Sequence, residues 1–348
     1  LGSSAAHAGT ALGLILASRI LGGICGANLT VAQAYIADIS PPEQRSRRMG
    51  LIGMAFGLGF ICGPLIAVVA LLKFGLAGPG WFAAALSAAN LGLMWCVLGE
   101  SRTGAAPAAV RRPGFAYWKE VLARPRVGVL VLLFFLATFA FTCFETTLGL
   151  LVARNFHFAP QGADAEIATA FLFAFCGLIG AFVQGGPLGR LVKRLGEPRL
   201  IAVSLVLVAV SLAPLPFLGG QIHHSPARLV DDHGVPWWRT LGLLFTLGGA
   251  PWALLLLALA VLAVGSGLTR PPLFGMLSLL SPPDEQGATL GVAQSAGSLA
   301  RIAGPVFASV AFGWSPAVPY LVCAAISLGA GVLAWAKLAR RSEPGTNP

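Results

Sequence analysis

Residues 40–50 read SPPEQRSRRMG, and residues 281–291 read SPPDEQGATLG. The two stretches align without gaps at an offset of 241 residues, and at the same offset a Gly-Pro pair at position 63 meets a second Gly-Pro pair at position 304. Each stretch follows one long apolar segment and precedes another. The repeat therefore predicts that a unit of several apolar helices occurs twice, in the same orientation.

Most of the chain is apolar enough to lie in a membrane. Of its 348 residues, 56% are hydrophobic and 10% are charged, whereas a soluble domain carries about 25% charged residues. Nine segments approach or exceed the roughly 18 to 20 residues that cross a bilayer, at 10–37, 47–72, 80–98, 127–151, 167–188, 199–218, 251–269, 288–312 and 316–336. The sequence therefore predicts an all-α integral membrane protein with nine transmembrane helices.

The formal charge of +10 follows from where the basic residues lie and does not require a nucleic-acid partner. Cytoplasmic loops of membrane proteins carry an excess of Lys and Arg. When each basic residue is assigned to a loop, 17 of the 23 lie on one side, including Arg270 after the span 251–269, and four lie on the other. This asymmetry predicts that the segment 99–126 and the C-terminus are cytoplasmic.

No cofactor and no metal is expected. The six cysteines lie in apolar spans without a closely spaced pair, which indicates small buried hydrophobic residues. The segment HHSPARLVDDHG at 223–234 contains His and Asp side chains, but their spacing matches no standard ligand pattern. We expect this segment to be a solvated loop.

Three signatures carry a resemblance to a known family: RILGGICGANLTVAQAYIADIS at 19–40, GMAFGLGFICGP at 53–64 and GRLVKRLGEPR at 189–199. They resemble the major facilitator superfamily, most closely its tetracycline and multidrug proton-antiporter branch. The resemblance implies the major facilitator fold, in which two pseudo-repeated helical bundles enclose a substrate site near the membrane midplane. About nine of the twelve helices of that fold are expected in this chain.

The repeat and the resemblance together divide the chain. Residues 1–98 are expected to be the last three helices of the N-terminal bundle, 99–126 a cytoplasmic linker, and 127–348 a C-terminal six-helix bundle with an outward insert at 219–250. We therefore expect helices 4 to 12 of the family fold, with the first three helices absent from this sequence. The alternative is a protein that has nine helices in its native form.

Three ionisable residues within the spans are proton-coupling candidates. Arg19 lies about nine residues, or roughly 14 Å, inside the first span, where a charge is costly unless it faces a cavity or a partner. The resemblance implies a coupling role for Arg19. Glu145, toward the outer end of its span, and the deeper Arg301 are the other candidates. Each could instead have a structural role, and Arg301 could also bind an anionic substrate.

Asp38, Arg45 and Arg194 are expected at a cytoplasmic gate. In the family an acidic residue at the position of Asp38 is the partner of a basic loop. That loop, between helices 2 and 3 of the family fold, is expected to be absent from this sequence. The segment 189–199 resembles its equivalent in the second half, although Lys193 stands where the family has an acid. A basic turn that only sets the topology is the alternative.

Small residues followed by proline are expected to form hinge or packing positions, because they let helices approach closely and bend. These positions are Gly59, Gly63, Pro64, Gly304 and Pro305. The antiporter signature ends in GPxxGG, whereas this chain has Ala67 and Val68 at the last two positions. That departure weakens the antiporter interpretation.

Four uncharged polar residues lie at membrane depth and are candidates for a substrate path, namely Asn28, Gln33, Gln184 and Gln294. Each could equally form an interhelical hydrogen bond of about 0.6 kcal/mol.

The function predicted from these features is secondary active transport by alternating access, as proton-coupled efflux of drugs or amphiphilic small molecules. The partners are then a small-molecule substrate, protons and the lipid bilayer. A facilitator or importer of sugars, organic acids or other metabolites is the alternative, and a non-transporting membrane receptor or an enzyme is a remote one. We expect a monomeric, multi-pass protein of a bacterial plasma membrane, and no enzymatic activity.

Overall fold

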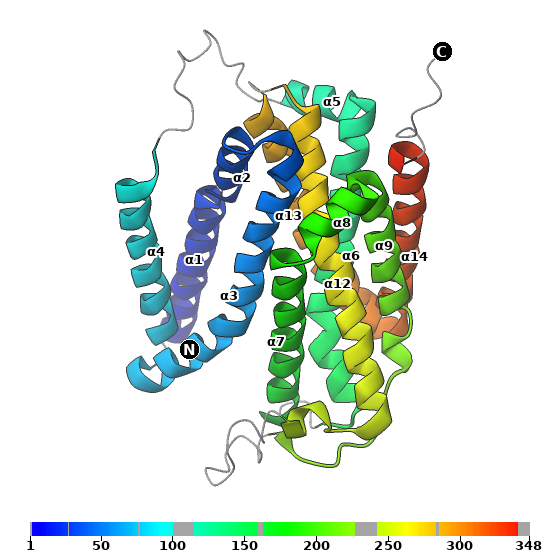
Figure 1. The fold of residues 1–348 in the computed structure, drawn as a ribbon. Coiled ribbons are helices and arrows are strands. Elements are labelled where there is room, and N and C mark those ends of the chain that lie inside the picture. Colours follow the sequence, from blue (N-terminus) through cyan, green and yellow to red (C-terminus); the bar gives the residue numbers. More distant parts are fainter. Residues whose placement is uncertain are drawn as a thin grey trace.

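The computed structural model describes residues 2–26, 28–75, 77–99, 115–158, 163–226, 242–282 and 285–339. All regular secondary structure in these ranges is helical (Figure 1). The N-terminal half consists of α1 (Gly2–Cys25), α2 (Asn28–Asp38), η1 (Pro42–Gln44), α3 (Arg45–Phe74) and α4 (Gly78–Val97).

The C-terminal half follows in chain order. It consists of α5 (Phe115–Ala123), α6 (Pro125–Asn155), α7 (Ala163–Gly185), α8 (Leu188–Leu195), α9 (Glu197–Leu212), η2 (Leu215–Phe217), α12 (Gly249–Leu280), α13 (Gln286–Trp314), α14 (Ala317–Ala334) and η3 (Trp335–Ala339). Much of the expected linker and of the expected outward insert, at 100–114 and 227–241, lies outside the described residues.

Eight helical segments of the described chain have the length and apolar composition needed to cross a membrane. They are Leu12–Asp38, Gly78–Val97, Pro125–Asn155, Asp164–Gly185, Glu197–Phe217, Gly249–Leu280, Gln286–Trp314 and Ala317–Ala339. The remaining expected span, 47–72, corresponds to α3, a helix of 30 residues.

Two of the expected spans differ in detail from the structure. The first is divided into α1 and α2, because the Gly26 amide donates to the Gly23 carbonyl at 3.2 Å and closes a tight turn that ends α1. The span expected at 251–269 continues to Leu280 through Pro271 and Pro272. Prolines are tolerated within transmembrane helices because neighbouring groups compensate for the lost backbone hydrogen bonds.

The hydrophobic core lies in the C-terminal half. Trp252, Tyr320 and Phe134 are among its largest fully buried side chains, and the indole of Trp252 donates to the Leu244 carbonyl at 2.9 Å. In contrast, α1 and α4 expose apolar side chains such as Trp95, which is 88% exposed. Such a surface is matched to lipid tails or to further helices.

The two halves meet where α3 lies against α7 and α12, and where α2 lies against α13. Gly50, Gly53 and Gly57 allow α3 to approach closely, since a Cβ atom on Gly57 would come within 2.8 Å of the Gly177 carbonyl oxygen. Gly59 and Gly63, farther along α3, have no atom within 4 Å of such a Cβ. The close contact between α3 and α7 therefore belongs to the first half of α3.

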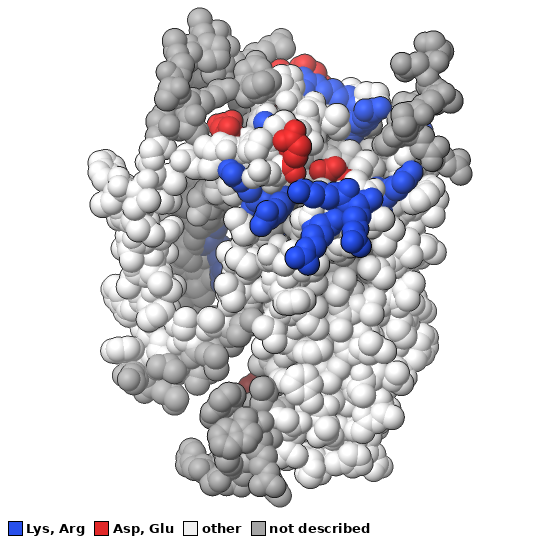
Figure 2. All heavy atoms as spheres, viewed as in Figure 1, with Lys and Arg blue, Asp and Glu red and all other residues white. Residues whose placement is uncertain are grey.

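Lys and Arg side chains gather at the end of the molecule that carries α5, α8 and the start of α3 (Figures 1 and 2). We call this the basic end. It is the end that the sequence predicts to be cytoplasmic.

Candidate functional site

A cavity of about 160 Å³ lies between the two halves. Its walls come from α2 and α3 on one side and from α6, α7, α9, α12 and α13 on the other. Its lining combines aromatic rings, amide side chains and two arginines. The aromatic rings are those of Phe56, Phe134, Phe141, Phe144, Phe173 and Phe274.

The aromatic wall is held together by ring contacts between helices. Phe134 of α6 meets Phe274 of α12 edge to face, with ring centroids 4.8 Å apart. Phe144 of α6 meets Phe173 of α7 in a similar arrangement, at 6.2 Å. Such pairs add roughly 0.5 to 1.5 kcal/mol beyond the burial of their area. The wall therefore offers a large and rigid apolar surface.

Arg270 lies in this cavity, and its assignment to a cytoplasmic loop was wrong. The residue sits ten positions before the end of α12, or about 15 Å at 1.5 Å per residue. Its guanidinium carbon lies over the ring of Phe141, 5.5 Å from the centroid, in a cation–π contact. The two following prolines resemble a helix end in the sequence, although α12 continues past them. The repeat does indicate that Arg270 lies within a helix, because at the 241-residue offset it corresponds to Leu29 inside the expected span 10–37.

Arg301 of α13 also lines the cavity. The ionised groups whose charges act on Arg270 are Arg301, which repels it, and Glu145, which attracts it. Arg270 is half-buried and Arg301 is exposed, and an anion near the two like charges would reduce their mutual repulsion. The cavity is therefore electrostatically suited to a negatively charged group.

Glu145 is exposed and lines a second, wider cavity of about 1040 Å³. This wide cavity lies at the end of α6 that is remote from α5. Its other ionisable residues are Arg154, His157 and Glu166. Within the described chain Glu145 forms no ion pair with Arg301. Glu145 thus lines the wide cavity, and its charge acts on Arg270 in the wall of the narrow one.

Three of the four expected substrate-path residues, Gln33, Gln184 and Gln294, line the central cavity, whereas Asn28 is exposed at the start of α2 and is not part of its lining. Gln294 of α13 donates from Nε2 to Gln33 Oε1 at 3.0 Å, which joins the two halves. The side chain of Gln184 fills the space over Gly53, where a Cβ atom would overlap with Gln184 Oε1.

Arg19 is not close to the other coupling candidates. It is exposed on α1, and α1 contributes no residue to either cavity. Within the described residues Arg19 forms no hydrogen bond or ion pair. The structure therefore brings Arg301 and Glu145 into the neighbourhood of Arg270 and leaves Arg19 outside.

The expected gate residues all lie at the basic end, but Arg45 bonds elsewhere than expected. Its guanidinium donates to the Ser40 carbonyl at 3.3 Å and to the carbonyl and hydroxyl of Ser278 on α12, at 3.3 and 3.1 Å. Arg194 is exposed on α8, and Asp38 is the last residue of α2. The charge of Arg45 is thus used to join α3 to the end of α12.

Gly304 and Pro305, two of the expected packing residues, lie on α13. Gly304 lies against α6, where a Cβ atom would come within 3.1 Å of Thr142 Cβ and where the Cys143 thiol donates to the Gly304 carbonyl at 3.4 Å.

The segment 223–234 was expected to be a loop without a metal, and its part from residue 227 onward lies outside the described residues. No group of three or more metal-ligating side chains occurs in the described part of the chain.

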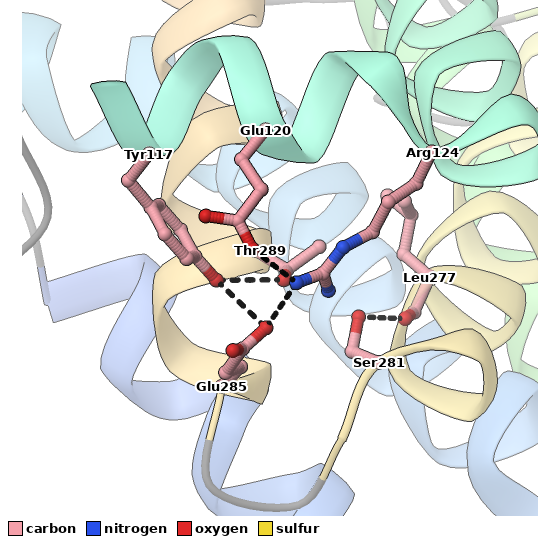
Figure 3. A network of polar contacts seen from close by, with 7 residues as sticks. All are labelled: Tyr117, Glu120, Arg124, Leu277, Ser281, Glu285 and Thr289. Carbon is pink, nitrogen blue, oxygen red and sulfur yellow. Dashed lines mark hydrogen bonds and ion pairs between the residues drawn. The ribbon is translucent and has the colours of Figure 1, made fainter. Parts of the chain in front are cut away.

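A polar network joins α5 to the start of α13 at the basic end (Figure 3). The Arg124 guanidinium donates to Glu285 at 2.6 Å and to Glu120 at 3.3 Å. The Tyr117 hydroxyl lies 3.4 Å from the Glu285 carboxylate and 3.3 Å from the Thr289 hydroxyl. The bond to Glu285 raises the pKa of Arg124, and burial raises the pKa of the Tyr117 phenol.

Known proteins resemble the chain over most of its length. The sequence profile described as Major Facilitator Superfamily matches residues 1–230 and 227–348. The chain is 30% identical over 335 residues to major facilitator superfamily domain-containing protein 10 of Bos taurus, covering 90% of this chain and 64% of the relative. It is 29% identical to the class E tetracycline resistance protein of Escherichia coli, covering 83% of this chain and 62% of that protein.

A solved structure has the same arrangement of helices. The crystal structure of the human organic anion transporter MFSD10 (TETRAN) superposes with a TM-score of 0.69 at 26% sequence identity, covering 92% of this chain and 70% of that one. The predicted all-helical membrane fold and its two bundles are thereby confirmed as a fold class. The chain therefore belongs to the major facilitator superfamily and is a multi-pass membrane protein.

Proposed function

We propose that the protein is a secondary transporter that moves amphiphilic organic anions across the membrane by alternating access. The carrying observation is the pair Arg270 and Arg301 in an aromatic cavity between the two halves. The arginines suit a carboxylate or sulfonate, and the phenylalanine rings suit an apolar body. The structural relative named an organic anion transporter supports this substrate class.

Members of the superfamily are transporters and not enzymes, which agrees with the class of function predicted from the sequence.

For the direction of transport we propose export in exchange for protons. The signatures at 19–40 and 53–64 and the relationship to a tetracycline resistance protein support this direction. We also propose a bacterial plasma membrane as the location.

A second candidate is the movement of the anion together with a proton, as in an importer of organic acids. The position of Glu145 favours it, because its negative charge acts on Arg270. A proton carried on Glu145 would offset the charge of an anion that binds at Arg270, so that the two could move together.

Transport in proteoliposomes tests the substrate class. We expect 4-aminohippurate, an aromatic carboxylate, to enter faster than the cation 1-methyl-4-phenylpyridinium. Arg270→Gln and Arg301→Gln should each lower the initial rate at least about tenfold, because a hydrogen bond to a charged group contributes about 1.5 to 3 kcal/mol. Arg126→Gln, an exposed change at the basic end, should leave the rate unchanged. Preferred transport of the cation, with both cavity variants active, would contradict the proposal.

A pH-sensitive dye trapped in the same vesicles tests the direction of coupling. Protons that move against the anion support exchange, and protons that move with it support the second candidate. In either case Glu145→Gln should remove the proton movement if Glu145 is the coupling group. Retention of full proton coupling in that variant would exclude Glu145.

A further inference from the structure

Four basic side chains form a cluster at the basic end, on the surface where the two halves meet. They are Arg47 of α3 and Arg190, Lys193 and Arg194 of α8, and all four are exposed. We call this cluster the basic seam. Arg47 reaches across from the N-terminal half, because a Cβ atom on Gly189 of α8 would lie 3.0 Å from Arg47 Cδ. Figure 2 shows Lys and Arg gathered in a band over this part of the molecule.

The charge of the basic seam is left largely uncompensated within the described chain. None of its four side chains forms a hydrogen bond or an ion pair with a described residue. The adjacent carboxylate, Glu197, accepts a hydrogen bond from the buried Ser46 hydroxyl at 3.1 Å. The four like charges repel one another, and an anion from outside the protein would reduce that repulsion.

The position of α8 identifies where that anion would come from. This helix connects two membrane spans, since α7 ends at Gly185 and the next span begins at Glu197. It therefore lies at the membrane surface. Its Leu188 and Val192 are buried against the protein, while Leu195, next to the basic residues, is 40% exposed. An amphipathic helix with a basic face is suited to the headgroup layer of anionic lipids.

We propose that the basic seam binds the phosphate headgroup of an anionic phospholipid in the leaflet at the basic end. The headgroup lies between Arg47 of one half and α8 of the other, so that one lipid molecule contacts both halves. The proposal concerns a site separate from the central cavity and does not depend on the transported substrate.

Native mass spectrometry of the detergent-solubilised protein tests this binding. The protein is titrated with phosphatidylglycerol and, in parallel, with phosphatidylcholine of the same acyl chains. We expect more bound phosphatidylglycerol than phosphatidylcholine. The Arg47→Gln/Arg190→Gln variant should bind phosphatidylglycerol roughly 30-fold more weakly, from the contribution of each basic residue to anionic-lipid attraction.

A matched control separates the site from net charge. Lys119→Gln/Arg126→Gln removes two exposed basic residues from the same end of the molecule and should keep the wild-type affinity within about twofold. Arg47→Lys/Arg190→Lys retains the charges and should retain most of the binding, which also shows that the seam tolerates substitution. An equal loss in the two Gln double variants would overturn the proposal. So would displacement of the lipid by millimolar inorganic phosphate, which would assign the seam to a soluble anion.

Discussion

Glu285 is contacted from two sides by residues of the segment that leads into α6. Arg124 bonds it at 2.6 Å and Tyr117 lies 3.4 Å away. The side chains of Arg124 and Glu285 are 28% and 32% exposed, so water screens the pair only in part. Glu285 also immediately precedes α13, where a negative charge interacts favourably with the helix dipole. These contacts hold α5 and α13 together at the basic end.

Removing either partner should therefore weaken the C-terminal half. We expect Arg124→Gln or Glu285→Gln to destabilise the protein by about 1 to 2 kcal/mol, since a hydrogen bond to a charged group is lost. The double variant should cost less than the sum of the two single variants, because they share one contact. Thermal unfolding in detergent measures the effect, and Arg126→Gln is the comparison. Strict additivity would show that the two side chains are not coupled.

The first half of α3 is the element that brings the two halves into close contact. Its glycines have different neighbours. A Cβ atom on Gly57 would meet the Gly177 backbone at 2.8 Å, whereas one on Gly53 would meet the end of the Gln184 side chain. A backbone atom cannot move aside as readily as the end of a long side chain. Gly59 faces open space.

Alanine substitutions along α3 should therefore destabilise the protein to different extents, in a fixed order. We expect Gly57→Ala to cost roughly 1 to 3 kcal/mol by overpacking, and Gly53→Ala to cost less because Gln184 can change its rotamer. Gly59→Ala should be neutral or stabilising by up to about 1 kcal/mol, from the higher helix propensity of Ala. Thermal unfolding of the three variants in one detergent measures this order. A Gly59→Ala variant as damaged as Gly57→Ala would contradict the described packing.

At the scale of the whole molecule, the side-chain hydrogen bonds that join the two halves within the described residues lie toward the basic end. Arg45 bonds Ser278, Ser46 bonds Glu197, and Gln294 bonds Gln33. Toward the opposite end the C-terminal half has its wide cavity of about 1040 Å³. Alternating access would require these bonds to break while the opposite end closes.

A disulfide across the halves should therefore arrest the cycle. Thr30 of α2 and Gly291 of α13 are close, since a Cβ atom on Gly291 would lie 3.9 Å from Thr30 Cγ2. In a background without the native cysteines, Thr30→Cys/Gly291→Cys should cross-link on mild oxidation and lose at least about 90% of transport, which a reductant restores. Thr30→Cys/Ser298→Cys, with the second thiol about two turns farther along α13, should remain active. Unimpaired transport by the cross-linked protein would exclude separation of α2 and α13 during the cycle.

Much of the fold could be predicted from the sequence, because the bilayer imposes the length and composition of its helices. Gln33, Gln184 and Gln294 line the cavity for a related reason, since polar side chains in apolar spans face the protein interior. Whether Asn28 or Arg19 faces a cavity depends on how α1 and α2 pack, which hydropathy does not encode. Arg270 was missed because paired prolines resemble the end of a helix, although packing sustains α12 through them.

Dissolved ions screen the charge of Arg270 and the charges of the basic seam to different extents. The Arg270 guanidinium lies over the Phe141 ring in the wall of the cavity, where mobile ions screen a charge less than they do at the surface. The exposed side chains of the basic seam lie in the surrounding electrolyte, whose screening length is about 8 Å at physiological ionic strength. We therefore expect a lipid headgroup bound at the basic seam to be released at a lower salt concentration than an anion bound at Arg270. Rising ionic strength should thus weaken the proposed lipid site more than the proposed substrate site.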